Sequence, residues 1–209
     1  MLNGIDVHDA QGPIKWSQVA NNNQFAFVRG AYGTRLDARL EDNFSGAKAN
    51  GLACGLYHFF RATQDFQKQA DLMCQALQKA GVGKGDLPPV LDVEDNPNYD
   101  GPWDPANNGK YIAGLRLWLA QVSNAAKCKP IIYTRAGFWS VLGNPAGFDA
   151  YPLWVAHYTS NPAPTLPHGW ASYAFWQYAE AGTTPGVPGS GDLDRFNGQQ
   201  ADLDKLRIA

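Results

Sequence analysis

Strand and helix patterns alternate along most of this chain, and this alternation restricts the fold more than any other feature of the sequence. Short apolar runs typical of buried strands are each followed by a segment with helical character. Strands that alternate with helices pair in parallel through right-handed crossovers. The strand segments lie at 5–8, 24–33, 54–60, 87–95 and 130–134, and the helical segments at 16–21, 42–50, 65–80, 110–126 and 136–142.

The pattern changes after residue 142. Three further strand segments, at 153–158, 173–178 and 192–196, are joined by Pro- and Gly-rich loops, and a short closing helix is expected at 202–208. Eight strands is the number that closes a barrel. We therefore predict an α/β protein with a modified TIM-like barrel, (β/α)5(β)3. α/β barrels of this size remain undivided, so we expect one domain over residues 1–209.

The fourth strand segment, Leu-Pro-Pro-Val-Leu-Asp-Val-Glu-Asp at 87–95, places two acids in an apolar run. Asp92 and Glu94 are two residues apart, so in a strand both carboxylates lie on one side, with Cα atoms roughly 6.5 Å apart. Burial and mutual repulsion make such a pair costly when both groups are ionised. The pair is either structural, capping the next loop or bound to an arginine, or part of a functional site.

Polar residues at the carboxyl ends of barrel strands converge on one mouth. In this chain the strand ends supply five acids and a belt of aromatic side chains, which is a layout typical of carbohydrate hydrolases. In chain order these residues are Asp6, His8, Arg29, Tyr32, Tyr57, His58, Asp92, Glu94, Tyr133, Trp154, His157, Tyr158, Trp176, Gln177, Tyr178, Asp192 and Asp194.

Charge and composition argue against several other classes of function. The formal net charge is −2 without a basic run, and no apolar run approaches the ~20 residues that span a membrane, so we expect no nucleic-acid partner and no membrane insertion.

The three cysteines lack metal-site spacing and are expected to be reduced thiols. An acid cluster could bind Ca²⁺ or Mg²⁺, but no EF-hand-like loop is present, and we expect no metal and no cofactor. His8, His58 and His157 are expected to be hydrogen-bonded structural residues.

Eight segments carry a family resemblance: GIDVH from residue 4, FVRGA from 27, GLYHF from 55, VLDVE from 90, IIYT from 131, LWVA from 153, FWQY from 175 and DLDRFNG from 192. In this order they resemble the glycoside hydrolase family 25 lysozymes, the Chalaropsis-type muramidases. The resemblance implies the same modified barrel. It also implies hydrolysis of the β-1,4 bond between N-acetylmuramic acid and N-acetylglucosamine in peptidoglycan glycan strands.

The resemblance also implies roles for four acids. Glu94 matches the family's general acid, Asp92 its partner on the same strand, Asp6 the acid of the first strand and Asp192 that of the last. Asp194 would face the same way as Asp192, but the family more often has Asn there, so Asp194 is expected to support the site. Asp92 is either a covalent nucleophile or orients the substrate's N-acetyl group for attack on the anomeric carbon, and we prefer the second. The spacing falls between the ~5 Å of retaining pairs and the ~6.5–9.5 Å of inverting pairs.

Substrate contacts are expected from four aromatic and two charged side chains, although each aromatic could equally fill the barrel interior. Of the aromatic residues, Tyr57 and Trp154 are favoured as sugar contacts. The full set is Tyr57, Trp154, Tyr133, Trp176, Arg29 and Asp194.

Two other functions compete with muramidase activity. A non-catalytic glycan-binding barrel has no need to maintain costly clustered acids. Chitinases carry a longer D-x-x-D-x-D-x-E pattern, of which only the terminal D-x-E is present. The chain enters its first strand almost at once, so either the protein has no secretory signal or the chain begins after one was removed and Met1 was added. We therefore expect a monomer made in the cytoplasm that acts on the bacterial cell wall, as a phage endolysin or another lytic enzyme, or as a domain excised from a longer secreted enzyme.

Overall fold

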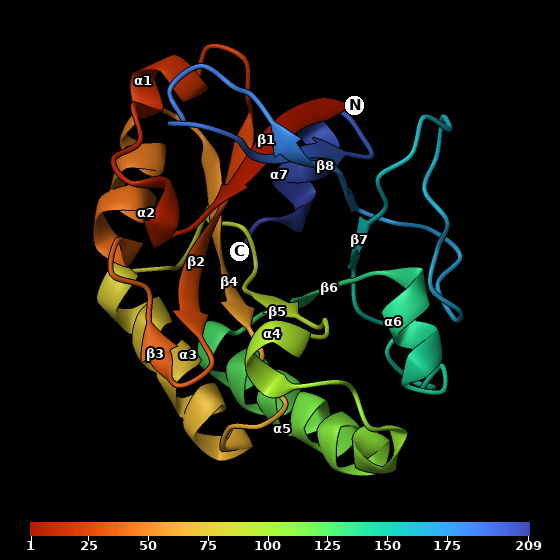
Figure 1. The fold of residues 1–209 in the computed structure, drawn as a ribbon. Helices are drawn as coiled ribbons and strands as arrows, with labels where there is room; N and C mark the ends of the chain where they lie inside the picture. Colours follow the sequence, from red (N-terminus) through yellow and green to blue (C-terminus); the bar gives the residue numbers. More distant parts are fainter.

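The computed structural model describes residues 1–209 and contains a nine-stranded sheet with helices packed around it (Figure 1). The strands are β1 (Leu2–Val7), β2 (Phe25–Tyr32), β3 (Arg35–Leu36), β4 (Ala53–Phe59), β5 (Val90–Asp92), β6 (Ile131–Thr134), β7 (Leu153–Ala156), β8 (Phe175–Gly182) and β9 (Gly191–Phe196). The helices are α1 (Trp16–Val19), α2 (Leu40–Ala49), α3 (Phe66–Ala80), α4 (Pro97–Asp100), α5 (Asn108–Ala126), α6 (Ala136–Val141) and α7 (Gln200–Leu206), with 3-10 turns η1 (Asp9–Gln11) and η2 (Pro105–Asn107). None of these helices combines the length and apolar character needed to span a membrane.

Eight of the strands close into a barrel. The strand order is β1-β9-β8-β7-β6-β5-β4-β2, and a further pairing between β1 and β2 closes the ring, while the two-residue β3 pairs only with β2. All neighbours from β1–β2 through β7–β8 are parallel. This arrangement confirms the predicted modified TIM-like barrel.

The last strand, β9, runs antiparallel to both of its neighbours, β8 and β1. Its beginning therefore lies at the mouth where the other seven strands end. In the register with β1, Asp192 lies opposite Asp6 and Asp194 lies opposite Gly4. The reversal thus places Asp192 at the mouth and Asp194 two residues deeper in the barrel.

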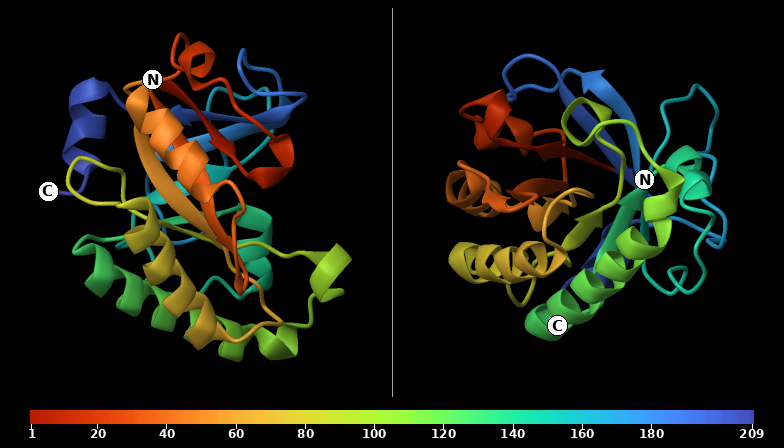
Figure 2. Two further views of the ribbon diagram at one scale, coloured as in Figure 1. Left: turned by 90° about the vertical axis from the view of Figure 1, so that its left-hand side faces the viewer. Right: turned by 60° about the horizontal axis from the view of Figure 1, so that its bottom comes forward.

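Three helices, α2, α3 and α5, lie side by side along one side of the barrel (Figure 2). Local sequence explains the ends of α3: the Asp65 carboxylate accepts a hydrogen bond from Lys68 N at 2.9 Å, and Gly81 ends the helix with φ of +67°. Its apolar stripe, which includes Ala70, Met73 and Leu77, is buried.

The structure differs from the sequence prediction in the segment 96–108, which was expected to be a loop. It contains the single helical turn α4 and the 3-10 turn η2. A proline, Pro97 or Pro105, occupies the first position of each turn, where the fixed φ of proline suits a helix start. β8 also continues to Gly182, four residues beyond the predicted end of that strand.

Aromatic side chains fill the barrel interior below its mouth. Phe25 and Phe27 project inward from β2 and pack on Phe175, and the Phe27 ring stacks on Trp154 with centroids 4.6 Å apart. A Cβ atom at Gly4 would lie only 2.4 Å from the Phe25 ring, so β1 needs a glycine there. Each fully buried Phe contributes roughly 1.5–3 kcal/mol. The interior is therefore mainly apolar, with Asp194 as a buried polar exception, and most polar side chains gather at the mouth.

Candidate active site

A cavity of about 240 Å³ opens at the carboxyl ends of β1, β2 and β4–β7. All four of the acids predicted to be catalytic lie in its wall. The lining residues are Asp6, His8, Arg29, Tyr32, Tyr57, Phe59, Asp92, Glu94, Tyr133, Trp154, Tyr158, Gln177, Glu180 and Asp192. We call this space the acid cavity.

Glu94 has the protonation behaviour of a general acid. Burial raises its pKa to about 7, and the nearby carboxylates of Asp95, Asp192 and Glu180 act in the same direction. The Arg135 guanidinium opposes them. A substantial fraction of Glu94 therefore carries a proton at neutral pH, which an acid catalyst requires.

Asp92 lies beside Glu94 and is 4% exposed. Burial and the neighbouring Glu94 and Asp6 carboxyl groups raise its pKa well above the usual range, while the Arg29 guanidinium opposes them. Its Oδ1 atom is buried and makes no hydrogen bond within the protein. A buried carboxylate oxygen without a hydrogen-bond partner is uncommon in native proteins, which is consistent with a functional role for Asp92.

The two acids contributed by β1 and β9 also favour their protonated forms. Burial, followed by the charge of Asp6, raises the pKa of Asp192 to about 9. Burial and the charge of Asp194 raise the pKa of Asp6 well above its usual range. Acids this close share protons rather than ionising independently, so the cluster holds hydrogen-bond donors as well as acceptors at neutral pH.

Gln177, from β8, connects Asp6 to two tyrosines. Its Nε2 atom donates to Asp6 Oδ2 at 2.7 Å, and its Oε1 atom accepts from the Tyr133 and Tyr158 hydroxyls, both at 2.8 Å. Gln177 is 4% exposed. A buried amide that uses both ends in this way fixes the orientation of all three partners.

Glu94 also lines two further cavities that adjoin the acid cavity. One, of about 280 Å³, is bounded by the segment 95–108 together with Thr63 and Phe66. The other, of about 490 Å³, is bounded by Arg135, His157 and Thr165 among others. Glu94 is the one residue shared by all three spaces, so a long ligand could pass it on either side.

Comparison with known proteins decides the family. Residues 5–187 match the family described as "Glycosyl hydrolases family 25". The chain belongs to this family. Lysozyme M1 of Streptomyces globisporus is 34% identical over 211 residues, which cover 97% of this chain and 70% of that protein. The N,O-diacetylmuramidase of Arthroderma benhamiae is 26% identical, with coverage of 98% and 86%. The crystal structure of the bacterial lysozyme from Streptomyces coelicolor superposes with a TM-score of 0.86 at 33% identity, covering 99% of this chain and 96% of that one.

The family match makes this protein a glycoside hydrolase. The matched residues end at 187, before β9 begins, so the match does not include Asp192. It is the pairing of β9 with β1 that places Asp192 in the acid cavity. Asp194 does not line the cavity. It is fully buried, and its Oδ1 atom accepts a hydrogen bond from Trp154 Nε1 at 2.9 Å.

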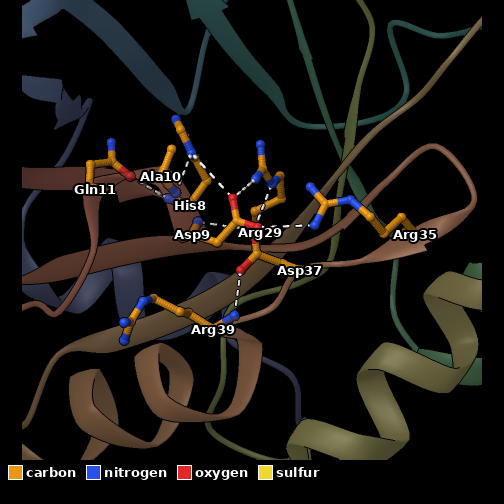
Figure 3. A network of polar contacts seen from close by, with 8 residues as sticks. All are labelled: His8, Asp9, Ala10, Gln11, Arg29, Arg35, Asp37 and Arg39. Carbon is orange, nitrogen blue, oxygen red and sulfur yellow. Dashed lines mark hydrogen bonds and ion pairs between the residues drawn. The ribbon is translucent and has the colours of Figure 1, made fainter.

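Arg29 lines the acid cavity of this family 25 protein, but its guanidinium is occupied by other side chains (Figure 3). Arg29 Nε donates to Asp37 at 2.8 Å, and Nη2 donates to Asp9. Arg35 also binds Asp9, at 3.1 Å, and Asp37 Oδ1 accepts from Arg39 N at 2.9 Å. Asp37 and Asp9 thus engage two of the five guanidinium N–H groups of Arg29, and its positive charge also acts on Asp92. The expected substrate contact from its remaining N–H groups stays a prediction.

The three histidines named from the sequence are hydrogen-bonded to the protein. His8 Nδ1 accepts from Ala10 N at 3.2 Å and caps η1, and His157 Nδ1 accepts from Thr165 N at 2.9 Å. His58 lies between Gly33 O and the Trp118 indole, and burial lowers its pKa to about 4. The predicted hydrogen bonding of the three histidines is therefore confirmed, and His8 also lines the acid cavity.

The aromatic residues expected to contact substrate divide into two groups. Tyr57, Tyr133 and Trp154 line the acid cavity and also pack on the barrel interior, so filling the barrel does not exclude a substrate contact, which stays a prediction. Trp176 does not line the cavity, because it points to the opposite side of β8 from Phe175 and Gln177. Its Nε1 atom donates to His157 O at 2.7 Å on the outside of the barrel.

Two cavity residues, Phe59 and Glu180, were not predicted from the sequence. Glu180 lies on the part of β8 that extends past residue 178. Glu180 is three residues from Gln177, so strict alternation would place the two side chains on opposite faces of β8. The register of β8 with β9 shifts between Gln177 and Ala179 and again between Ala179 and Gly182, and no local sequence pattern signals these shifts.

Proposed function

We propose that this protein is a lysozyme (N-acetylmuramidase) that hydrolyses the β-1,4 bond between N-acetylmuramic acid and N-acetylglucosamine, with Glu94 as the general acid. The observation that carries the assignment is a carboxyl group with a pKa of about 7 at the junction of three cavities in a family 25 barrel. Such a group can protonate the oxygen of the leaving sugar at neutral pH.

Asp92 acts on the other side of the scissile bond. The negative charge of Glu94 is one of the causes that raise the pKa of Asp92. While Glu94 is protonated this charge is absent, and the pKa of Asp92 is lower. The Arg29 guanidinium also favours the ionised form of Asp92. The unpartnered Oδ1 atom can accept a hydrogen bond from the N–H of the substrate's acetamido group. The acetamido carbonyl oxygen would then attack the anomeric carbon. The alternative is direct attack by Asp92.

Asp6 and Asp192 hold the reacting groups and supply or accept protons. Asp6 is oriented by Gln177, and Asp192 lies opposite it across the β1–β9 pair. Tyr57, Tyr133 and Trp154 give the sugar its contacting surface, because each presents one edge or face to the acid cavity.

The first experiment compares the wild type with Glu94→Gln on purified peptidoglycan, using mass spectrometry of the soluble products. Fragments that end in reducing N-acetylmuramic acid, released by the wild type and lost in the variant, support a muramidase with Glu94 as its acid. Binding without release on several wall types would contradict the proposal and favour the glycan-binding module.

A second experiment tests the role of Asp92. The anomeric configuration of the first-formed product is measured by NMR during hydrolysis of a soluble oligosaccharide. Both neighbouring-group participation and a covalent intermediate require retention. Inversion would rule out both.

The domain, the oligomeric state and the place of action are part of the proposal. The catalytic domain spans residues 1–209, since Ile208 exchanges backbone hydrogen bonds with Gly85 and Asp86 at 2.8 and 2.9 Å. One chain supplies every residue of the acid cavity, which suits a monomer. The enzyme would act on the glycan strands of the bacterial cell wall after release from the cytoplasm that made it.

A further inference from the structure

The single turn α4 carries the most exposed large hydrophobic residue of the protein, at the carboxyl end of β5 (Figure 1). Tyr99 is 74% exposed, compared with 46% for Tyr158. The turn begins at Pro97 and closes with a hydrogen bond from Asp100 N to Asn96 O at 2.8 Å. The Tyr99 backbone is therefore held in a defined conformation.

A buried ion pair fastens α4 to the end of β4. Arg61 Nε and Nη2 donate to the two carboxylate oxygens of Asp100 at 2.6 and 2.7 Å, and Thr63 Oγ1 donates to the same carboxylate. The two charged side chains are only 7% and 8% exposed. A two-point contact between a guanidinium and a carboxylate fixes both orientation and distance.

The Tyr99 ring is held as well as its backbone. The Arg61 guanidinium carbon lies 5.6 Å from the ring centroid, and Tyr32 packs edge-on at 6.3 Å. Tyr32 in turn packs on Phe59 at 4.9 Å and accepts a hydrogen bond from Asn96 at 2.6 Å. Since Phe59 and Tyr32 line the acid cavity, three rings lead from that cavity to the surface.

The Tyr99 ring is thus largely open to solvent while Arg61 and Tyr32 lie against it. The acid cavity, at about 240 Å³, is smaller than the roughly 300–1,000 Å³ of sites that enclose a drug-sized ligand, so most of a glycan polymer must lie outside it. Flat aromatic faces bind the C–H surfaces of sugar rings. We propose that Tyr99 is a stacking platform for a sugar unit of the glycan strand beyond the acid cavity, on the side of Tyr32. This inference rests on the proposed muramidase function.

The test measures kcat/KM for long, soluble glycan strands and for the shortest oligosaccharide that the enzyme cleaves. A platform outside the cavity contributes only when the substrate reaches it. Tyr99→Ala should lower the ratio of the two values roughly two- to twelvefold, which is the fold-change equivalent to the about 0.5–1.5 kcal/mol of one stacked ring. Tyr99→Phe retains the ring and should keep the wild-type ratio.

Val141→Ala, at an exposed apolar residue on α6, is the matched control and should leave the ratio unchanged. Thermal unfolding of each variant verifies that the fold is intact. An unchanged ratio in Tyr99→Ala, or equal losses on long and short substrates, would overturn the platform while leaving the muramidase proposal in place. Absence of cleavage by the wild type would instead overturn the proposed function.

Discussion

Gln177 Nε2 donates a hydrogen bond to Asp6 Oδ2 at 2.7 Å, although the two residues are 171 positions apart in the chain. The bond passes from β8 to β1, two strands that are separated in the barrel by β9. The other end of the same amide holds the hydroxyls of Tyr133 and Tyr158. One side chain therefore sets the positions of an acid and two phenols in the wall of the acid cavity.

Replacing Gln177 with Leu should lower kcat by roughly 10–100-fold with a smaller change in KM. Leu leaves Asp6, Tyr133 and Tyr158 without their shared partner, and the two buried groups among them, on Asp6 and Tyr133, each cost about 1–3 kcal/mol when orphaned. Steady-state kinetics on soluble glycan strands measure the effect. Gln75→Leu, on the exposed face of α3, is the control and should behave as the wild type. Equal loss in both variants would contradict the positioning role.

The pH dependence of kcat/KM should show an alkaline limb near pH 7, because Glu94, with a pKa of about 7, must be protonated to act. Arg135→Met removes the cation that lowers this pKa and should move the limb up by roughly 0.5–1 pH unit. Asp95→Asn removes a carboxylate that raises it and should move the limb down. Asp192, Glu180 and Asp92 also face Glu94 and stay unchanged in both variants. If the alkaline limb moved in the same direction in both variants, a group other than Glu94 would be the one whose ionisation produces it.

Glu94→Gln should be more stable than the wild type above pH 7. The folded-state pKa of Glu94 is raised from 4.5 to about 7, so the stability it contributes is complete below pH 4.5 and is lost as the pH rises through 7. Glutamine has no proton to lose. Urea unfolding at pH 4 and pH 8 should therefore give a difference between the two proteins that is larger at pH 8. A difference independent of pH would contradict the assigned shift.

Asp194 and Asp192 should respond differently to the same substitution. Asp194→Asn keeps an oxygen acceptor for Trp154 Nε1 and should retain activity, whereas Asp192→Asn should lower kcat by roughly 100-fold or more. Burial raises the pKa of Asp194, so its contribution to stability is lost as the pH rises. At pH 8 the free energy of unfolding of Asp194→Asn should therefore be roughly 1–3 kcal/mol higher than that of the wild type. Loss of activity in Asp194→Asn with an active Asp192→Asn would reverse their roles.

Much of the fold could be predicted from the sequence because each strand and helix has a local pattern. The direction of β9 could not. The alternation in Asp-Leu-Asp-Arg-Phe is the same read either way, and the partner strands, β1 and β8, are chosen by contacts distant in sequence. The reversal decides that Asp192 lies at the mouth and Asp194 below it, so the sequence alone supplied no geometric reason for that order.

The acids of the candidate site could be named because a carboxylate in an apolar strand is conspicuous. Gln177 could not be assigned its role, since an amide has the same local signal whether it is bound to three side chains or to water. Trp176 was placed at the mouth on its aromatic character, although strict alternation with Phe175 and Gln177 already points it outward. α4 was missed because a four-residue turn is too short to show helical periodicity.

The antiparallel pairing of β9 with β1 joins the two ends of the chain at the seam of the barrel, and the same seam carries Asp6 and Asp192. Closing the barrel and completing the acid cavity are thus one event. A chain cleaved before β9 has neither a closed sheet nor a full set of acids, so it should lose hydrolytic activity and barrel integrity together.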